Sequence, residues 1–265
     1  MKTVILCGGQ GTRIRDASDH LPKPMLPIGG RPIVWHIMKS YASYGFAEFV
    51  LCLGYRGWVI KEFFLNYRAM LTDVTVNLGP ERTVTFHEVP SHDDWTVTLA
   101  DTGEDTQTGA RVARIRKYVE RDDLFMMTYG DGVADVDIAA LVAFHRAHGR
   151  IATVTAVRPP GRFGELTAVG GRVEAFNEKS QAGGGLINGG FLVFDAKRVW
   201  PYLEGDASLV LEREPLQRLS ADGELMAYEH GGFWQPMDTF REYQLLNDLW
   251  NTGNVPWDRA TRLHV

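Results

Sequence analysis

Two short segments near the N-terminus carry the residue types that bind phosphate groups. The first is the turn Gly8-Gly9-Gln10-Gly11-Thr12-Arg13, and the second is Pro22-Lys23-Pro24. Glycines let successive backbone N–H groups face phosphate oxygens. Arg13 adds a planar group of fixed charge, and Lys23 adds a compact charge on a backbone restrained by its two prolines. The pair of segments therefore predicts a site for a triphosphate.

Two other phosphate-binding motifs fit this turn poorly. A P-loop ends in Gly-Lys-Ser/Thr, whereas this turn ends in Gly-Thr-Arg, and a dinucleotide-binding turn needs a third glycine where Ile14 stands. The dinucleotide motif also continues into a helix, but residues 16–27 contain three prolines. A nicotinamide-dependent reductase is therefore a weaker alternative, and on the turn alone a purely structural loop stays open.

Two aspartates later in the chain have surroundings that suit a Mg²⁺ ion. Asp131 lies between Gly130 and Gly132, directly after an apolar run, and Asp238 follows Trp-Gln-Pro-Met. Mg²⁺ prefers one or two carboxylates together with water and phosphate oxygens. Taken singly, Asp131 also fits an ordinary turn, and Asp238 also fits the N-cap of a last helix. A metal site requires the fold to bring them together.

The elements that must position these residues alternate between strands and helices. Apolar runs that predict buried strands cover Val4–Cys7, Glu48–Gly54, Leu124–Thr128 and Ile151–Val157. Periodic segments that predict helices cover Ile33–Tyr44, Trp58–Met70, Ile138–His148, Leu209–Leu219 and Arg241–Trp250. This alternation predicts an α/β protein with a Rossmann-like, doubly wound, mostly parallel sheet. Ligands of such sheets bind at the carboxyl ends of the strands, where Gly8 and Asp131 fall.

The remaining segments complete the expected layout. Val74–Asn77 and Val84–His87 are expected to be the third and fourth strands, and residues 90–109 a hairpin or long loop. Short strands near Leu166 and Val173 predict a small β-rich elaboration in the C-terminal half. Because no linker changes the composition of the chain, we expect one domain over residues 1–265.

Composition excludes several classes of protein. The 265-residue chain has a formal net charge of −5 and no basic run, which argues against a nucleic-acid partner. No apolar run approaches the ~20 residues that a membrane span needs, and the Met-Lys start lacks a signal-peptide core. Cys7 and Cys52 lie in apolar runs and are expected to be buried, reduced thiols. We therefore expect a cytoplasmic protein without a membrane partner.

The complete pattern of Gly-Gly-x-Gly-Thr-Arg followed by Pro-Lys-Pro resembles the signature of the sugar-1-phosphate nucleotidylyltransferases. Tyr-Gly-Asp131-Gly and Trp-Gln-Pro-Met-Asp238-Thr resemble the two motifs with which that family binds its metal, so the resemblance implies Mg²⁺ at Asp131 and Asp238. It also implies nucleotide contacts at Leu6, Gly8, Gly9, Gly11, Thr12, Arg13, Lys23, Thr108, Arg111 and Asp131.

Three further segments resemble the sugar side of the family's site. They are Arg162-Phe-Gly164, Phe176-Asn-Glu178-Lys179 and Leu186-Ile-Asn188-Gly-Gly-Phe191. The resemblance implies that the sugar is bound by Gly164, Glu178, Lys179 and Asn188. It further implies that Arg13, Lys23 and Lys179 are catalytic, because phosphoryl transfer needs charge neutralisation and alignment rather than a nucleophilic side chain.

Within this family the chain is most similar to members that use CTP and glucose 1-phosphate. The similarity rests on the motifs above together with Thr108-Gly109-Ala110-Arg111, where a second glycine usually stands in place of Ala110. UTP, dTTP and another hexose 1-phosphate therefore stay open as substrates. A nucleotide-sugar sensor without catalysis is the alternative from another class, disfavoured because Lys23 and Asp238 are both present. The resemblance also implies a homo-oligomer, such as a hexamer.

Overall fold

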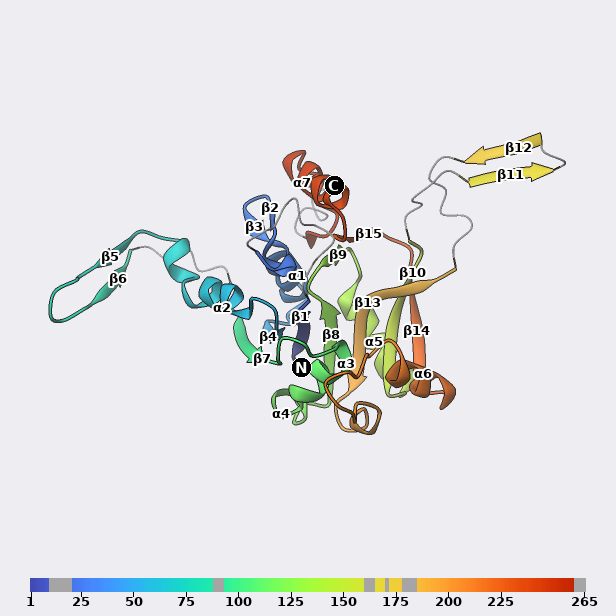
Figure 1. The fold of residues 1–265 in the computed structure, drawn as a ribbon, viewed down its shortest axis with the longest axis horizontal. Coiled ribbons are helices and arrows are strands. Elements are labelled where there is room, and N and C mark those ends of the chain that lie inside the picture. The colour runs from blue at the N-terminus through green and yellow to red at the C-terminus, as the bar shows by residue number, and fades with distance from the viewer. Residues whose placement is uncertain (10–20, 88–92, 160–164, 170–171, 178–184, 260–265) are drawn as a thin grey trace.

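A seven-stranded sheet with the order β14-β10-β13-β8-β1-β4-β7 forms the centre of the fold (Figure 1). The computed structural model describes residues 1–9, 21–87, 93–159, 165–169, 172–177 and 185–259. The strands of the sheet are β1 (Thr3–Cys7), β4 (Glu48–Leu53), β7 (Thr96–Asp101), β8 (Leu124–Tyr129), β10 (Ala152–Val157), β13 (Ile187–Asp195) and β14 (Leu225–His230).

The sheet is mostly parallel, as predicted. The pairs β1–β4, β4–β7, β1–β8 and β10–β14 are parallel, and β13 runs antiparallel to both of its neighbours. From β1 the chain builds outward to β7 and then crosses to β8 on the other side of β1. The strand order therefore reverses between β1 and β8, which is where sheets of this kind bind their ligands.

Helices cover both faces of the sheet because its strands are apolar on both faces. In β1, Ile5 and Cys7 lie in one buried cluster and Val4 and Leu6 in the other. The first cluster includes residues of α1 (Ile33–Ala42), α2 (Gly57–Leu65), α5 (Ile138–His148) and α7 (Phe240–Asn251). The second includes residues of α3 (Thr108–Arg114), α4 (Arg116–Val119) and α6 (Glu214–Ala221). The prediction of an α/β fold is confirmed.

The edge strand β7 lies within residues 90–109, where we predicted a hairpin or long loop, so that prediction is wrong. The strand β7 pairs in parallel with β4, and Val97 and Leu99 pack against the apolar cluster of α1. By contrast, β5 (Val74–Val76) and β6 (Val84–Phe86) form a separate antiparallel hairpin outside the main sheet. The alternation of threonine with apolar residues in β7 is that of a half-covered edge strand.

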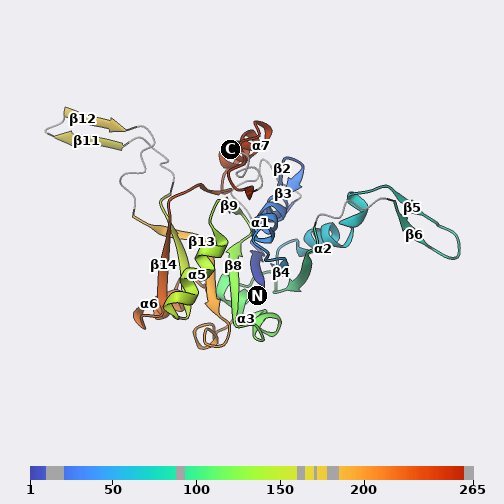
Figure 2. The ribbon, with the colours of Figure 1, turned by 180° about the vertical axis from the view of Figure 1, so that it is seen from behind.

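Short ribbons complete the described part of the chain. β11 (Glu165–Val169) and β12 (Arg172–Asn177) pair outside the main sheet, and Figures 1 and 2 both show this ribbon projecting beyond β10. β2 (Pro27–Ile28) pairs with β3 (Arg31–Pro32), and β9 (Gly132–Ala134) pairs with β15 (Trp234–Pro236). None of the helices in the described ranges is both long and apolar enough to cross a membrane.

Candidate active site

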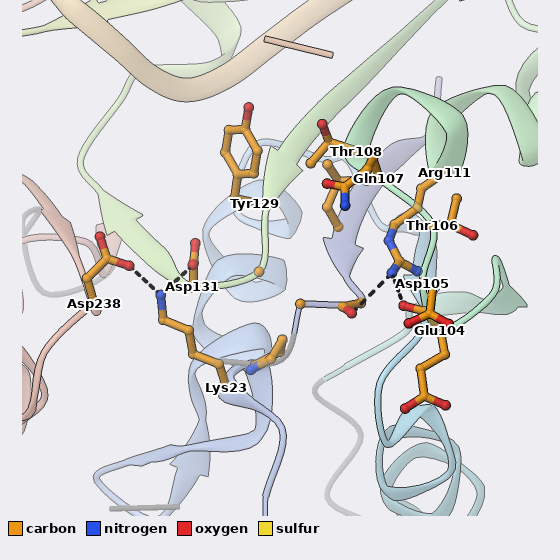
Figure 3. A pocket seen from close by; sticks show the side chains of 15 residues that line it. Lys23, Glu104, Asp105, Thr106, Gln107, Thr108, Arg111, Tyr129, Asp131 and Asp238 are labelled. Atoms are coloured by element: carbon orange, nitrogen blue, oxygen red, sulfur yellow. Dashed lines mark hydrogen bonds and ion pairs between the residues drawn. The ribbon is translucent and has the colours of Figure 1, made fainter. Parts of the chain in front are cut away.

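A cavity of about 580 Å³ opens at the carboxyl ends of β1 and β8, where the strand order reverses (Figure 3). Eight of the residues predicted from sequence line it, namely Leu6, Gly8, Gly9, Lys23, Thr108, Arg111, Asp131 and Asp238. The rest of its wall is Pro24, Glu104, Asp105, Thr106, Gln107, Tyr129 and Gly130. Residues from five distant segments thus meet at the predicted edge of the sheet.

Lys23 lies between the two predicted metal ligands. Its Nζ donates to Asp131 Oδ2 at 2.6 Å and to Asp238 Oδ1 at 2.5 Å. The lysine side chain is only 11% exposed, and the two carboxylates are 35% and 30% exposed. Burial works against the ammonium form, but the two carboxylates outweigh it and hold the pKa of Lys23 above its ordinary value. The fold therefore gathers two carboxylates around one cationic group.

Local structure fixes Lys23 and Asp131. Lys23 begins a single 3-10 turn that Pro22 precedes, and the following Pro24 and Met25 are buried. The backbone at Asp131 is held from both sides, because Gly130 N donates to Leu6 O at 3.0 Å and Met237 N donates to Asp131 O at 2.8 Å. A Cβ on Gly130 would lie 2.9 Å from Leu6 O, so a larger residue would push β8 away from β1.

Asp238 lies immediately before the N-cap residue of α7 and does not cap this helix itself. The N-cap is Thr239, whose side chain accepts from Glu242 N, while Glu242 Oε2 accepts from Thr239 N at 2.8 Å and from Asp238 N at 2.7 Å. The alternative in which Asp238 is the N-cap is therefore wrong. The capping box occupies the helix end and leaves the Asp238 carboxylate for Lys23 and the cavity.

Arg111 lines the cavity and also holds it together. Its buried guanidinium donates to five oxygens: the carbonyl oxygens of Gly8, Leu53, Gly103 and Glu104, and the hydroxyl oxygen of Thr102. Burial lowers the pKa of this guanidinium from its ordinary value. The turn after β1, the end of β4 and the loop before α3 all meet on this one side chain. Arg111 thus acts as a structural frame for the wall of the cavity that β1, β4 and the loop before α3 form.

The Thr108 side chain also makes hydrogen bonds within the protein. Its hydroxyl donates to Glu212 Oε2 at 2.6 Å and accepts from Leu211 N at 2.9 Å. The backbone amides of Gln107 and Ala110 donate to the carbonyl oxygens of Ala207 and Leu209. The first turn of α3 is thereby fixed against residues 207–211 and forms a rigid wall of the cavity.

A second, smaller cavity of about 60 Å³ adjoins the first on the side of β13. Its walls are Thr128, Tyr129, Asp131, Gly132, Asn188, Gly189, Gly190, Phe191, Trp234 and Pro236, so it includes the predicted sugar-binding Asn188. Tyr129 and Asp131 line both cavities. Trp234 Nε1 donates to Gly189 O at 2.7 Å and joins the Asp238 segment to β13. Asp131 thus lies where the two cavities meet.

Six predicted site residues lie outside the described residues: Gly11, Thr12, Arg13, Gly164, Glu178 and Lys179.

Three residues of the site were not predicted from the sequence, namely Tyr129, Trp234 and Glu212. Tyr129 and Trp234 are the first residues of the two motifs that contain Asp131 and Asp238, and their aromatic rings were the available signal. Glu212 carries no local pattern, because its role comes from contacts with residues about 80 and 100 positions away.

Comparison with known proteins agrees with this geometry. The family model described as Nucleotidyl transferase matches residues 2–215. The glucose-1-phosphate cytidylyltransferase of Salmonella typhi is 49% identical over 257 residues, which are 97% of this chain and 98% of that protein. The probable glucose-1-phosphate cytidylyltransferase of Bacillus subtilis is 42% identical, with 97% of this chain and 99% of that protein covered.

Solved structures with the same fold are more distant in sequence. A putative glucose-1-phosphate thymidylyltransferase from Bacillus anthracis has a TM-score of 0.67 at 19% identity, covering 94% of each chain. The inositol-1-phosphate CTP transferase from T. maritima has a TM-score of 0.62 at 16% identity, covering 94% of this chain and 95% of that one. The fold, the paired cavities and these relatives lead to one conclusion: the chain belongs to the nucleotidyl transferase family, as its sequence motifs had indicated.

Proposed function

We propose that this protein condenses CTP with α-D-glucose 1-phosphate to give CDP-glucose and pyrophosphate. The observation that carries the proposal is the meeting of Lys23, Asp131 and Asp238 in the larger cavity, which is large enough for a nucleotide, where Asp131 also lines the smaller cavity beside it. The relatives that are 42% and 49% identical carry the name of this activity.

The reaction needs positioning and charge neutralisation more than it needs a base. A phosphate monoester has a second pKa near ~6, so glucose 1-phosphate is largely dianionic at neutral pH. One of its oxygens forms a bond to the α-phosphorus of CTP while the bond from that phosphorus to the bridging oxygen breaks. Pyrophosphate leaves with the electron pair. Lys23, which lines the larger cavity and donates to Asp131, neutralises charge on the reacting phosphates.

Asp131 and Asp238 are the residues that would hold Mg²⁺. Their fit to a cation is visible in the structure, because one oxygen of each lies within 2.6 Å of the same ammonium nitrogen. Two carboxylates completed by water and phosphate oxygens are the donor set that Mg²⁺ prefers. The metal would supply further charge neutralisation to the triphosphate.

The predicted residues outside the described ranges have roles in the same proposal. Gly11 and Thr12 continue the phosphate-binding turn, and Arg13 binds the departing pyrophosphate. Lys179 binds the sugar phosphate, while Gly164, Glu178 and Asn188 contact the hexose. We further propose that residues 1–265 act as one domain in a cytoplasmic homo-oligomer, such as a hexamer.

The proposal is tested by product analysis and by one substitution. The purified protein with CTP, glucose 1-phosphate and Mg²⁺ is expected to release pyrophosphate together with a product of the mass of CDP-glucose. Asp131→Asn keeps the size of the side chain but removes its charge, so turnover is expected to fall by about 100-fold or more while the thermal midpoint changes little. Asp248→Asn, at an exposed position on α7, is the control.

Absence of the product with the wild-type protein would contradict the proposed function and favour the sensor alternative. Near wild-type turnover of Asp131→Asn in Mg²⁺ would contradict the assignment of Asp131 alone. The two results are distinguishable because the first concerns the reaction and the second concerns one ligand.

A further inference from the structure

A series of side-chain hydrogen bonds connects the two cavities on the side away from Lys23. Thr108 Oγ1 donates to Glu212 Oε2 at 2.6 Å, and the Tyr129 hydroxyl donates to the other carboxylate oxygen, Glu212 Oε1. Asn188 Nδ2 donates to the same tyrosine hydroxyl at 3.4 Å. One carboxylate therefore joins a residue of the nucleotide wall to a residue that borders the sugar side.

Tyr129 is the shared wall of the two cavities. Its ring packs against Gly190, where φ is +83° and a Cβ would lie 2.7 Å from the ring. Figure 3 shows its hydroxyl directed away from Asp131 and Lys23. The ring is therefore fixed at its face by β13 and at its tip by Glu212.

Glu212 itself lines neither cavity and lies in the exposed turn before α6. Its neighbour Leu211 is buried, and Leu211 N donates to Thr108 Oγ1. The carboxylate is thereby carried on a well-anchored backbone and accepts from two hydroxyl groups on two different elements. A group that moves Thr108 changes the position of the acceptor that holds Tyr129.

We propose that Glu212 is a positioning residue that couples the two substrate sites, holding Thr108 on the nucleotide side and Tyr129 on the sugar side. The inference rests on the proposed function, because it places CTP in the larger cavity and the hexose of glucose 1-phosphate on the side of the smaller one. Binding of one substrate orders the Thr108–Glu212–Tyr129 unit for the other, and by linkage the effect is reciprocal. Because Glu212 does not contact the reacting phosphates, we expect its substitution to change the dissociation constants of the substrates more than the rate of the chemical step.

The test measures this coupling directly. Glucose 1-phosphate is titrated by calorimetry into the protein with Mg²⁺, in the absence and presence of saturating α,β-methylene-CTP, which cannot react. The ratio of the two dissociation constants is the coupling factor. Because a hydrogen bond to a charged group is worth about tenfold in an equilibrium constant, Glu212→Ala is expected to reduce the coupling factor by about tenfold.

Three companion variants separate positioning from a purely structural role. Tyr129→Phe removes the hydroxyl but keeps the ring, and is expected to reduce coupling as much as Glu212→Ala does. Glu212→Gln keeps one acceptor oxygen and is expected to be intermediate. Glu214→Ala is the matched control, since this exposed carboxylate two residues further along pairs only loosely with Arg218, at 3.6 Å.

The double variant Glu212→Ala/Tyr129→Phe is expected to lose no more coupling than either single variant, because both act through one contact. Wild-type coupling and wild-type KM values in Glu212→Ala would overturn the inference. If the wild-type protein itself forms no CDP-glucose, the proposed function fails first, and this result is told apart by the product assay on the unaltered chain.

Discussion

Arg111→Lys tests whether Arg111 is mainly a frame for the cavity or mainly a ligand for the nucleotide. The arginine donates five hydrogen bonds to Gly8, Leu53, Thr102, Gly103 and Glu104 while it is only 5% exposed. Lysine keeps the positive charge but has three donors at a single nitrogen. At least two of the five acceptors therefore lose their hydrogen bond from residue 111 in the variant.

The magnitude follows from this count. Gly8 O and Leu53 O keep other donors, and Gly103 O and Glu104 O are only partly buried, so no acceptor pays the full cost of isolation. Each lost hydrogen bond then costs about 1 kcal/mol net, and two of them cost about 2 kcal/mol. With a urea dependence of about 2–3 kcal/mol per molar, this loss moves the unfolding midpoint down by about 1 M. The effect needs no ligand, because all five acceptors belong to the protein itself.

The assay is urea unfolding of the ligand-free protein, followed by tryptophan fluorescence, together with KM for CTP. The control is Arg116→Lys, on the exposed side of α4, where the ion pair with Glu120 contributes at most a few tenths of a kcal/mol. We expect Arg111→Lys to lower the midpoint and also to raise KM. An unchanged midpoint with a greatly raised KM would refute the frame and make Arg111 a direct nucleotide ligand.

Three further predictions address the turn, the last helix and pH. A Cβ on Gly8 would lie 2.1 Å from Arg111 Cζ, so Gly8→Ala is expected to lower the free energy of unfolding in urea by about 2 kcal/mol or more. Gly9→Ala is the control, because no described heavy atom lies within 4 Å of its Cβ, and it should change the free energy of unfolding by less than about 0.5 kcal/mol. Glu242→Ala removes the acceptor for two backbone N–H groups and should cost about 1 kcal/mol while lowering kcat, and an unchanged kcat would show that Asp238 does not need this support. Burial lowers the pKa of His36 and His145 to about 4 from 6.5, so the unfolded chain binds more protons between these values. Their contribution to stability is present above pH 6.5 and should be lost as pH falls toward 4. Urea midpoints that stay constant or rise as the pH is lowered from 6.5 to 4 would contradict this prediction.

The buried strands and the phosphate-binding motifs were predictable because each is a local signal. Val4–Cys7 and Leu124–Thr128 are short apolar runs typical of strands covered on both faces, and the glycines after them mark the ligand edge. The meeting of Asp131 with Asp238 could only be suspected, since 107 positions separate them. The structure supplies it through the pairing of β9 with β15.

The features that the sequence did not reveal depend on pairing partners. The strand β7 was missed because its threonines resemble those of a loop until β4 pairs with it. Arg111 carried a motif that suggested a nucleotide contact, but its five hydrogen bonds come from segments that are distant in sequence. Glu212 had no signal at all, because its two partners lie on α3 and β8.

The measurement that tests the account most directly is pyrophosphate release with glucose 1-phosphate, Mg²⁺ and each of CTP, UTP, dTTP, ATP and GTP. The account predicts that CTP has the highest kcat/KM and that the product with CTP is CDP-glucose. A higher kcat/KM with another triphosphate would contradict the proposed nucleotide. No release with any of the five would contradict the proposed reaction.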